Sequence, residues 1–334
     1  MLPPLIESLG LTDPGVYLCL FLAASLLMLW RLEAMLDHGL EGTALGTLVM
    51  PYCSGLGNLL FVFILTQRGG PPADVLTNCL VNNVSNLTLL LGLPAVLWGL
   101  QVTTDAAKGG KARGKAAVSA AGAQINRLSL MLTLTAVLFF SGAAWLLAED
   151  GRLSRTDGLL LIGLFLFWQC FQVFDVLKHN VRHKVSLGGM FYVDVALVLL
   201  SAWLIYGTLD WLVAWIGTQQ DGFVSAANLG WLSGWLMVLP NALLALYWGM
   251  KRRADVVYSS QVGDGHICIP LCIGLLAMLT PVAVPPFFLT GLLLLIGAVV
   301  VHGALLLAAG GLPRWGGAGL IAAYAWFVWA GLLS

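Results

Sequence analysis

The chain has 334 residues, of which 59% are hydrophobic and only 10% are charged, and its formal net charge is zero. Soluble globular domains carry about 25% charged residues, so the composition excludes that class. The lack of a basic surplus also argues against nucleic acid as a partner. The sequence therefore predicts an integral membrane protein whose main surrounding is the lipid bilayer.

Apolar stretches of about 20 residues, the length that crosses a bilayer, divide the chain into about ten predicted membrane helices. Tryptophans such as Trp98 and Trp248 lie near the ends of these stretches, where aromatic side chains anchor at the headgroups. The fold class is accordingly all-α. In chain order the predicted spans are Gly15–Leu36, Thr43–Thr66, Val75–Leu100, Leu128–Leu147, Gly158–Val176, Met190–Trp215, Ala227–Met250, Gly263–Thr280, Pro285–Leu307 and Leu320–Leu333.

Basic residues gather in alternate loops between these spans. Cytoplasmic loops of membrane proteins carry an excess of Lys and Arg, so these loops are predicted to be cytoplasmic and both termini non-cytoplasmic. Short loops and compact size favour a bacterial inner membrane. The basic residues are Lys108, Lys111, Arg113, Lys115 and Arg127 after the third span, Lys178, Arg182 and Lys184 after the fifth, and Lys251, Arg252 and Arg253 after the seventh.

Two segments of the chain look like copies of one another. The first runs from Cys53 through Asn58 to Gly92, and the second from Leu236 through Asn241 to Gly274. Their loops fall on opposite predicted sides of the membrane. The sequence therefore predicts two inverted halves, residues 1–184 and 185–334, each with five helices.

Glycine and proline interrupt the predicted helices inside both copies, at Gly55, Gly57, Pro240, Gly263 and Pro270. Such breaks expose backbone groups at membrane depth and are tolerated where protein or a water-filled cavity covers them. Matched breaks in two inverted halves are typical of a transport site near the middle of the membrane. The alternative is that the small residues only allow helices to pack closely.

These segments resemble the α-repeats of the sodium/calcium exchanger superfamily of cation antiporters, with their pattern G-T-S-x-P-E followed by G-N-x-x-G-S-N-x-x-N/D. Ser54 takes the threonine position, and the run Asn86–Gly92 and the turn Asp150–Gly158 are close to the family form. In the second copy Pro240 and Gly263 match the pattern. The resemblance covers essentially the whole chain. It implies ten helices in two inverted five-helix repeats.

The departures from the family pattern fall on the ion ligands. The resemblance implies that Asn58 and Asn241 take the places of the two calcium-binding glutamates, and Cys268 that of a third acidic residue. Met237 and Val238 take the places of sodium-binding hydroxyls. Calcium requires six to eight oxygen ligands with carboxylates among them, and a divalent cation without counter-charge is costly in the membrane. Calcium exchange is therefore not expected.

The polar residues that remain in the repeats are the candidate ion site. Asp264 and His266 could form a proton-titrating pair or a monovalent-cation site, since ionisable residues inside a membrane are usually functional. The asparagines offer neutral oxygens for Na⁺ or K⁺. Both groups could instead form structural hydrogen bonds between helices. The candidates are Asn58, Asn82, Asn83, Asn86, Asn241, Asp264 and His266, with Ser54 and Cys268 as secondary candidates.

Two functional hypotheses follow. The first is a divergent secondary transporter that exchanges a monovalent cation or a proton, with no cofactor other than the transported Na⁺ or H⁺. The alternative is a subunit that no longer transports and acts as a scaffold for partner subunits of a larger membrane complex. Loss of both glutamates favours this alternative. No nucleotide-binding or hydrolase motif is present, so an enzyme is not expected.

Overall fold

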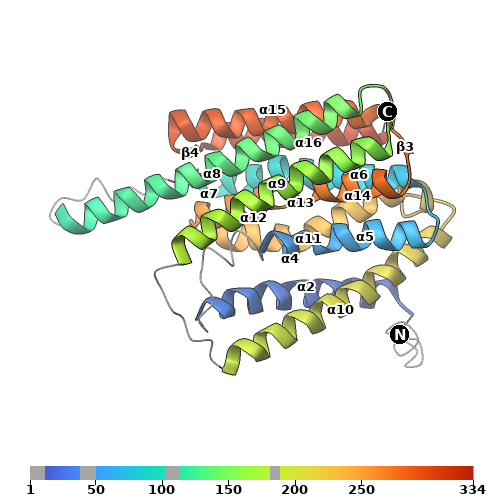
Figure 1. The fold of residues 1–334 in the computed structure, drawn as a ribbon, viewed down its shortest axis with the longest axis horizontal. Helices are drawn as coiled ribbons and strands as arrows, with labels where there is room; N and C mark the ends of the chain where they lie inside the picture. Colours follow the sequence, from blue (N-terminus) through green and yellow to red (C-terminus); the bar gives the residue numbers. More distant parts are fainter. Residues whose placement is uncertain (1–11, 38–49, 103–112, 181–188, 334) are drawn as a thin grey trace.

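The computed structural model describes residues 12–37, 50–102, 113–180 and 189–333. The described chain is built almost wholly from helices (Figure 1). The first half holds α2 (Pro14–Asp37), α4 (Met50–Ser54), α5 (Leu56–Gln67), α6 (Pro72–Val84), a π-helical turn η2 (Ser85–Leu90), α7 (Leu91–Trp98), α8 (Arg113–Leu147) and α9 (Arg155–Asn180). The second half holds α10 (Gly189–Thr218), η4 (Ala226–Asn228), α11 (Leu229–Met250), α12 (Ala254–Gly263), α13 (Gly265–Ile267), a second π-helical turn η5 (Cys268–Cys272), α14 (Ile273–Leu279), α15 (Pro286–Ala309), α16 (Arg314–Val328) and η6 (Trp329–Leu333).

The described residues contain nine helical stretches long and apolar enough to cross a membrane, which confirms the all-α membrane class. The predicted span Thr43–Thr66 differs from the others because it is broken: α4 ends at Ser54 and α5 begins at Leu56. Alpha5 has only twelve residues. Residues 43–49 lie outside the described part of the chain. The break falls at Gly55, where the sequence predicts an interruption.

Two short antiparallel strand pairs reveal how the halves are related. β1 (Leu100–Gln101) follows α7 and pairs with β4 (Gly311–Leu312), which precedes α16. β3 (Val282–Ala283) follows α14 and pairs with β2 (Arg152–Leu153), which precedes α9. The run α6–η2–α7–β1 thus recurs as α12–α13–η5–α14–β3, with a π-helical turn in the same place. The predicted inverted-repeat fold is confirmed.

The predicted junction between the halves, at residues 184 and 185, lies outside the described residues. So do the basic loops at residues 103–112 and 181–188 on which the predicted orientation depends. The repeat boundary, the orientation of the termini and the bacterial inner membrane therefore stay predictions.

Glycine pairs bring equivalent helices into backbone contact in both halves. A Cβ atom on Gly92 of α7 would lie 2.9 Å from the carbonyl oxygen of Gly317 in α16. A Cβ atom on Gly158 of α9 would lie 2.6 Å from the carbonyl oxygen of Gly274 in α14. Lipid tails are as apolar as the helix surfaces, so the hydrophobic effect does not drive membrane helices together. They associate instead through close packing of this kind. These two glycine pairs fix the outer helices α16 and α9 against the central ones.

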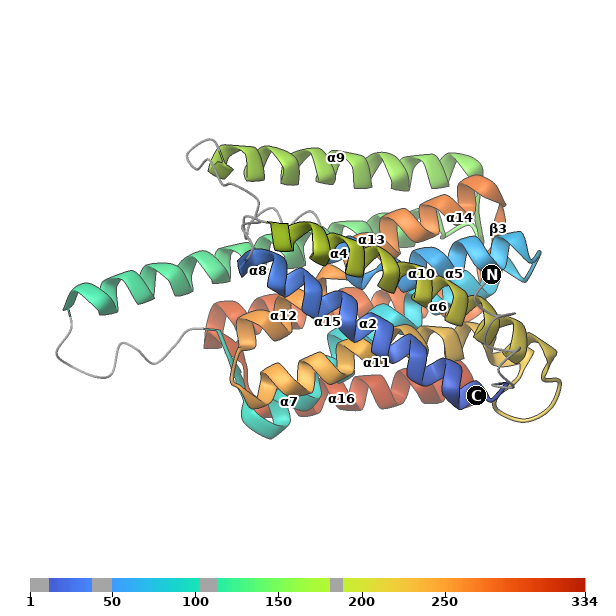
Figure 2. The same ribbon diagram turned by 90° about the horizontal axis from the view of Figure 1, so that it is seen from below.

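Two long helices form the centre of the molecule. The stretches Pro72–Trp98 and Ala254–Leu279 are the most deeply buried of the nine, and both carry a π-helical turn. At one edge, α2 and α10 lie side by side as a pair, along the lower edge of the molecule in Figure 1 and crossing its face in Figure 2. Tyr17 of α2 stacks on Trp211 of α10, with ring centroids 3.8 Å apart. The candidate site lies between the central helices and this pair.

Candidate functional site

The site is centred on the carboxyl group of Asp264, which joins α12 to α13 and is fully buried. Asn86 of η2 donates a hydrogen bond of 3.0 Å from Nδ2 to Asp264 Oδ2. Asn241 of α11 donates one of 2.6 Å to the same oxygen. One carboxylate oxygen thus accepts hydrogen bonds from residues of both inverted halves.

Helix breaks in the sequence allow this convergence. Alpha12 ends at Gly263, and Pro270 lies inside the π-helical turn that follows. Proline removes a backbone donor, and π-helical turns shift the helix face by one residue, a feature common at functional sites. In the first half, η2 carries Asn86 and is followed by Pro94 within α7. Both central helices therefore change register where they meet.

Two further side chains surround the same carboxyl group. Ser54, the last residue of α4, and Asn82 of α6 both lie close enough to interact with it. Asn82 also donates to the sulfur of Cys268, at 3.4 Å. Asp264 is therefore surrounded by a hydroxyl group and three neutral amides, and the thiol lies one hydrogen bond further away.

Several buried oxygens at the site have no hydrogen-bond donor among the described residues. They are Oδ1 of Asp264, Asn82 and Asn86. Asn58, on α5 beyond the break at Gly55, is also fully buried, and neither its Oδ1 nor its Nδ2 has a partner among the described residues. An unsatisfied buried polar group costs about 1–3 kcal/mol. A cation among these oxygens would supply the missing partner.

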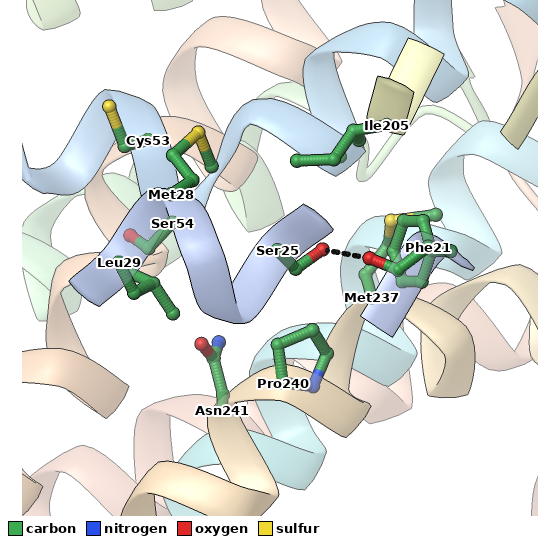
Figure 3. A pocket seen from close by; sticks show the side chains of 11 residues that line it. Phe21, Ser25, Met28, Leu29, Cys53, Ser54, Ile205, Met237, Pro240 and Asn241 are labelled. Atoms are coloured by element: carbon green, nitrogen blue, oxygen red, sulfur yellow. Dashed lines mark hydrogen bonds between the residues drawn. The ribbon is translucent and has the colours of Figure 1, made fainter. Parts of the chain in front are cut away.

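A small cavity of about 20 Å³ adjoins the site, between the α2–α10 pair and the main body (Figure 3). Ser54 and Asn241 line it, opposite Ser25 and Met28 of α2. A cavity of this size holds about one water molecule. The site is thus separated from the α2–α10 pair by a gap that one small ion or water fits.

The structure brings Ser54, Asn82, Asn86 and Asn241 to Asp264, and Cys268 next to Asn82, as the sequence suggests. Asn83 points elsewhere. Its Nδ2 donates to the carbonyl oxygen of Cys79 on its own helix, at 2.7 Å. Its Oδ1 lies against the backbone of Gly265, where a Cβ atom would come within 3.3 Å. Asn83 therefore helps to pack the two central helices and makes no described contact with Asp264.

The predicted pair of Asp264 and His266 does not form in the described residues. His266 Nε2 lies 3.1 Å from the carbonyl oxygen of Thr133 in α8. Its ring packs against Phe140 and Trp168, with centroids 6.1 and 5.2 Å apart. Residues two apart on a helix are separated by about 200° of rotation, so the two side chains point in opposite directions. His266 belongs to the contact between α13 and α8.

Sequence reasoning missed Gln261, which lies one turn before Asp264 on α12 and is fully buried. Its Nε2 lies 3.4 Å from the backbone oxygen of Asn241, and its Oε1 has no partner among the described residues. An amide three residues before a buried carboxylate shares its helix face, and that spacing is the signal that could have identified it.

The donor set indicates which ions the site could hold. Among the described residues no group of three or more His, Cys, Asp or Glu side chains could hold a metal ion. Asp264 is the one carboxylate in the group described above, and the other ligands are neutral. Calcium binds best where several carboxylates balance its charge.

Comparisons with known proteins agree with this architecture. The model of the sodium/calcium exchanger protein family matches residues 15–174. The structure is similar to that of the sodium-calcium exchanger NCX_Mj soaked with Na⁺ and Sr²⁺, with a TM-score of 0.67 and 16% sequence identity over 96% of this chain and 97% of that chain. It is also similar to the crystal structure of the H⁺/Ca²⁺ exchanger CAX, with a TM-score of 0.70 and 15% identity over 99% of this chain and 86% of that chain.

No curated protein matches the sequence. At 15–16% identity the two structural neighbours show a shared fold, and the ligands that they bind do not transfer to this chain.

Proposed function

We propose that the chain is a secondary cation transporter of the sodium/calcium exchanger superfamily and that it exchanges Na⁺ or K⁺ for protons across its membrane. The match of residues 15–174 to the family model and the shared fold support this proposal. Asp264 is the proposed exchange group. It binds the metal cation in one state and a proton in the other.

The observation that carries the proposal is the charge of the site. Asp264 contributes one negative charge, and the residues around it are amides, a hydroxyl and a thiol. A monovalent cation or a proton leaves the site neutral. Calcium would leave an uncompensated positive charge in surroundings of low dielectric constant, which is strongly unfavourable.

The oxygens without donors support both states of the exchange cycle. With the cation bound, Oδ1 of Asp264 and the amide oxygens of Asn82, Asn86 and Asn58 act as hard ligands, which Na⁺ and K⁺ prefer. With the cation absent, a proton on Oδ1 of Asp264 finds amide oxygens that lack a donor. Because both ions need the same carboxylate, they compete for it, and competition couples their fluxes.

The arrangement of the helices supports access from both sides in turn. The site lies where the central helices of two inverted repeats meet, as in many secondary transporters. The cavity beside Ser54 and Asn241 separates it from the α2–α10 pair. Small displacements of this pair relative to the main body would open the site to one side or the other.

The test is gradient-driven flux in proteoliposomes that contain a pH-sensitive dye. We expect an imposed Na⁺ or K⁺ gradient to change the internal pH, and Asp264→Asn to abolish the change. Ser141→Ala is the control, because Ser141 is a buried residue of α8 whose hydroxyl has no partner among the described residues. Calcium flux without Na⁺ or K⁺ flux, or full activity in Asp264→Asn, would refute the proposal.

One observation favours the alternative function, a scaffold subunit. Met237 of α11 fills the space beside Gly57, where a Cβ atom would lie 2.4 Å from its sulfur, and the adjoining cavity is small. A site plugged in this way would suit a chain that holds partner subunits and moves no ion. Purification from native membranes in mild detergent separates the two functions. A stoichiometric partner, together with no flux in any gradient, supports the scaffold.

We also propose that both termini lie on the non-cytoplasmic side of a bacterial inner membrane. Basic residues in alternate loops support this orientation. Reporter domains fused to either terminus, one active only in the cytoplasm and one only outside it, test it directly.

A further inference from the structure

His302 of α15 makes two hydrogen bonds in the centre of the protein, and neither belongs to the site described above. Its Nε2 lies 2.7 Å from the carbonyl oxygen of Leu87, and its Nδ1 lies 3.1 Å from the hydroxyl of Tyr258. His302 and Tyr258 are both fully buried. A carbonyl oxygen can only accept, so the hydrogen must be on Nε2. Nδ1 then accepts the hydrogen bond that Tyr258 donates.

The π-helical turn η2 changes the hydrogen bonds around the carbonyl oxygen of Leu87. In an α-helix the amide four residues further on, that of Leu91, would bond to the Leu87 oxygen. Here the Leu91 amide donates to the oxygen of Thr88. The hydroxyl of Thr88 in turn donates to the oxygen of Val84. The Nε2–H group of His302, on α15, therefore donates a hydrogen bond to the backbone of the turn η2.

We propose that His302 and Tyr258 form a brace that positions Asn86 against Asp264. Leu87, which His302 holds, is the residue after Asn86, whose Nδ2 bonds to the carboxylate. Tyr258 lies on α12, the helix that leads into Asp264. The hydrogen bonds of the brace and of the site thus close a ring that joins η2, α15 and α12.

The proposal rests on the function proposed above and names two positioning residues for its ion site. The oxygen of Asn86 that would bind the cation is fixed by the position of its backbone in η2, a turn that is not held by regular helix bonds alone. Some residues do not bind a metal ion themselves but orient its ligands through hydrogen bonds. Removing such a residue typically lowers the affinity of the site for the ion 10- to 100-fold. His302 contacts no candidate ligand side chain in the described residues, so its effect would act through the backbone of Leu87.

Four variants test the brace. His302→Phe keeps a ring and removes both nitrogens, whereas His302→Gln keeps an N–H donor that can reach Leu87. Tyr258→Phe removes the hydroxyl alone. Ser141→Ala is again the control, because the buried hydroxyl of Ser141 has no hydrogen-bond partner among the described residues. The first measurement is hydrogen exchange of peptides covering residues 84–93 in the detergent-solubilised protein. The second is the concentration of NaCl or KCl that gives half of the cation-dependent rise in Tm.

We expect His302→Phe to increase exchange at residues 84–93 and to raise the half-saturating cation concentration at least about tenfold. We expect His302→Gln to restore the concentration to within about threefold of the wild-type value, and Tyr258→Phe to fall between the two. Unchanged exchange at residues 84–93 in His302→Phe overturns the brace. Where the wild-type protein binds the cation, increased exchange with unchanged cation affinity also overturns it, because His302 would then only satisfy a buried carbonyl.

The two proposals fail in different ways. If no monovalent cation raises the Tm of the wild-type protein, the proposed exchange function fails, and hydrogen exchange alone decides the brace. The brace is then supported if exchange at residues 84–93 increases in His302→Phe and returns to the wild-type level in His302→Gln. If exchange does not increase in His302→Phe, the brace is refuted.

Discussion

Asn241 Nδ2 and Asp264 Oδ2 lie 2.6 Å apart, so the asparagine that the sequence resemblance matches to a glutamate is bonded directly to the one carboxylate of the site. A glutamate at residue 241 would repel Asp264 unless a cation lay between them. The amide removes this repulsion and donates a hydrogen bond instead. This pairing explains how the site remains stable with a single negative charge, and it leads to the first prediction.

Adding carboxylates to the site should make it prefer a divalent cation to a monovalent one. We expect the double variant Asn58→Glu with Asn241→Glu to be destabilised without ions and to be stabilised by Ca²⁺, by about 3 kcal/mol at a hundredfold excess over Kd. Thermal unfolding with CaCl₂, NaCl or KCl measures the effect. The control is Asn83→Asp, because the Asn83 side chain bonds to its own helix. An equal response to Ca²⁺ in this control would contradict the assignment.

Asn86 and Asn83 should differ sharply although they are only three residues apart. Asn86→Ala removes a donor to Asp264 and a candidate cation oxygen, so we expect the affinity for Na⁺ or K⁺ to fall about 10- to 100-fold. Asn83→Ala removes a bond to Cys79 and should change the affinity less than threefold, while it lowers the Tm. Cation titrations of both variants, followed by thermal shift, separate the two roles. Equal losses would place Asn83 at the site.

The glycine contacts predict large effects from the smallest substitution. Gly92→Ala and Gly158→Ala each push a methyl group against a backbone oxygen, and we expect each to cost about 1–3 kcal/mol of unfolding free energy. Gly163→Ala on α9 has open space around it and should be neutral, or stabilising by up to about 1 kcal/mol. Unfolding titrations with SDS compare the three variants. A neutral Gly158→Ala would show that α9 and α14 are not in backbone contact.

Arg68 and Asp210 form an ion pair, 2.7 Å from Nη2 to Oδ1, whose side chains are 42% and 27% exposed. Exposed ion pairs contribute about 0–1 kcal/mol, so we expect Arg68→Ala to change the unfolding free energy by no more than this. A double-mutant cycle with Asp210→Asn, measured at low and high salt, gives the coupling energy. A coupling well above 1 kcal/mol would mean that the pair holds α10 to the loop after α5 more firmly than its exposure suggests.

The class of fold was readable from the sequence because its signals are local. Long apolar stretches define most helices to within a few residues, as at α11, and Gly55 marks the break between α4 and α5. The spacing of Asn82 and Asn86, one helical turn, predicts that they share a face. Asn83 lies three residues before Asn86 and fits that face equally well, so only the structure separates it from the site. Asp264 was identified because ionisable residues are costly in a membrane.

The remainder of the site depends on tertiary geometry that no local pattern encodes. His266 was predicted at the site because it lies two residues from Asp264, but the helical path through α13 turns it toward Thr133. The π-helical turn at Leu87 shifts the helix face by one residue, and sequence periodicity does not reveal where such a shift occurs. Its partner His302 is 215 residues away along the chain. Only the folded helices bring these groups together.

The crossed strand pairs have a consequence for how the chain is made. β1 and α7 of the first half pair and pack with β4 and α16 of the second half, which are synthesised much later. The central helix that carries Asn86 therefore lacks a permanent neighbour until α16 has entered the membrane. Assembly of the binding centre then waits for α16, and a chain truncated before Arg314 would leave the first half unfinished as well as the second.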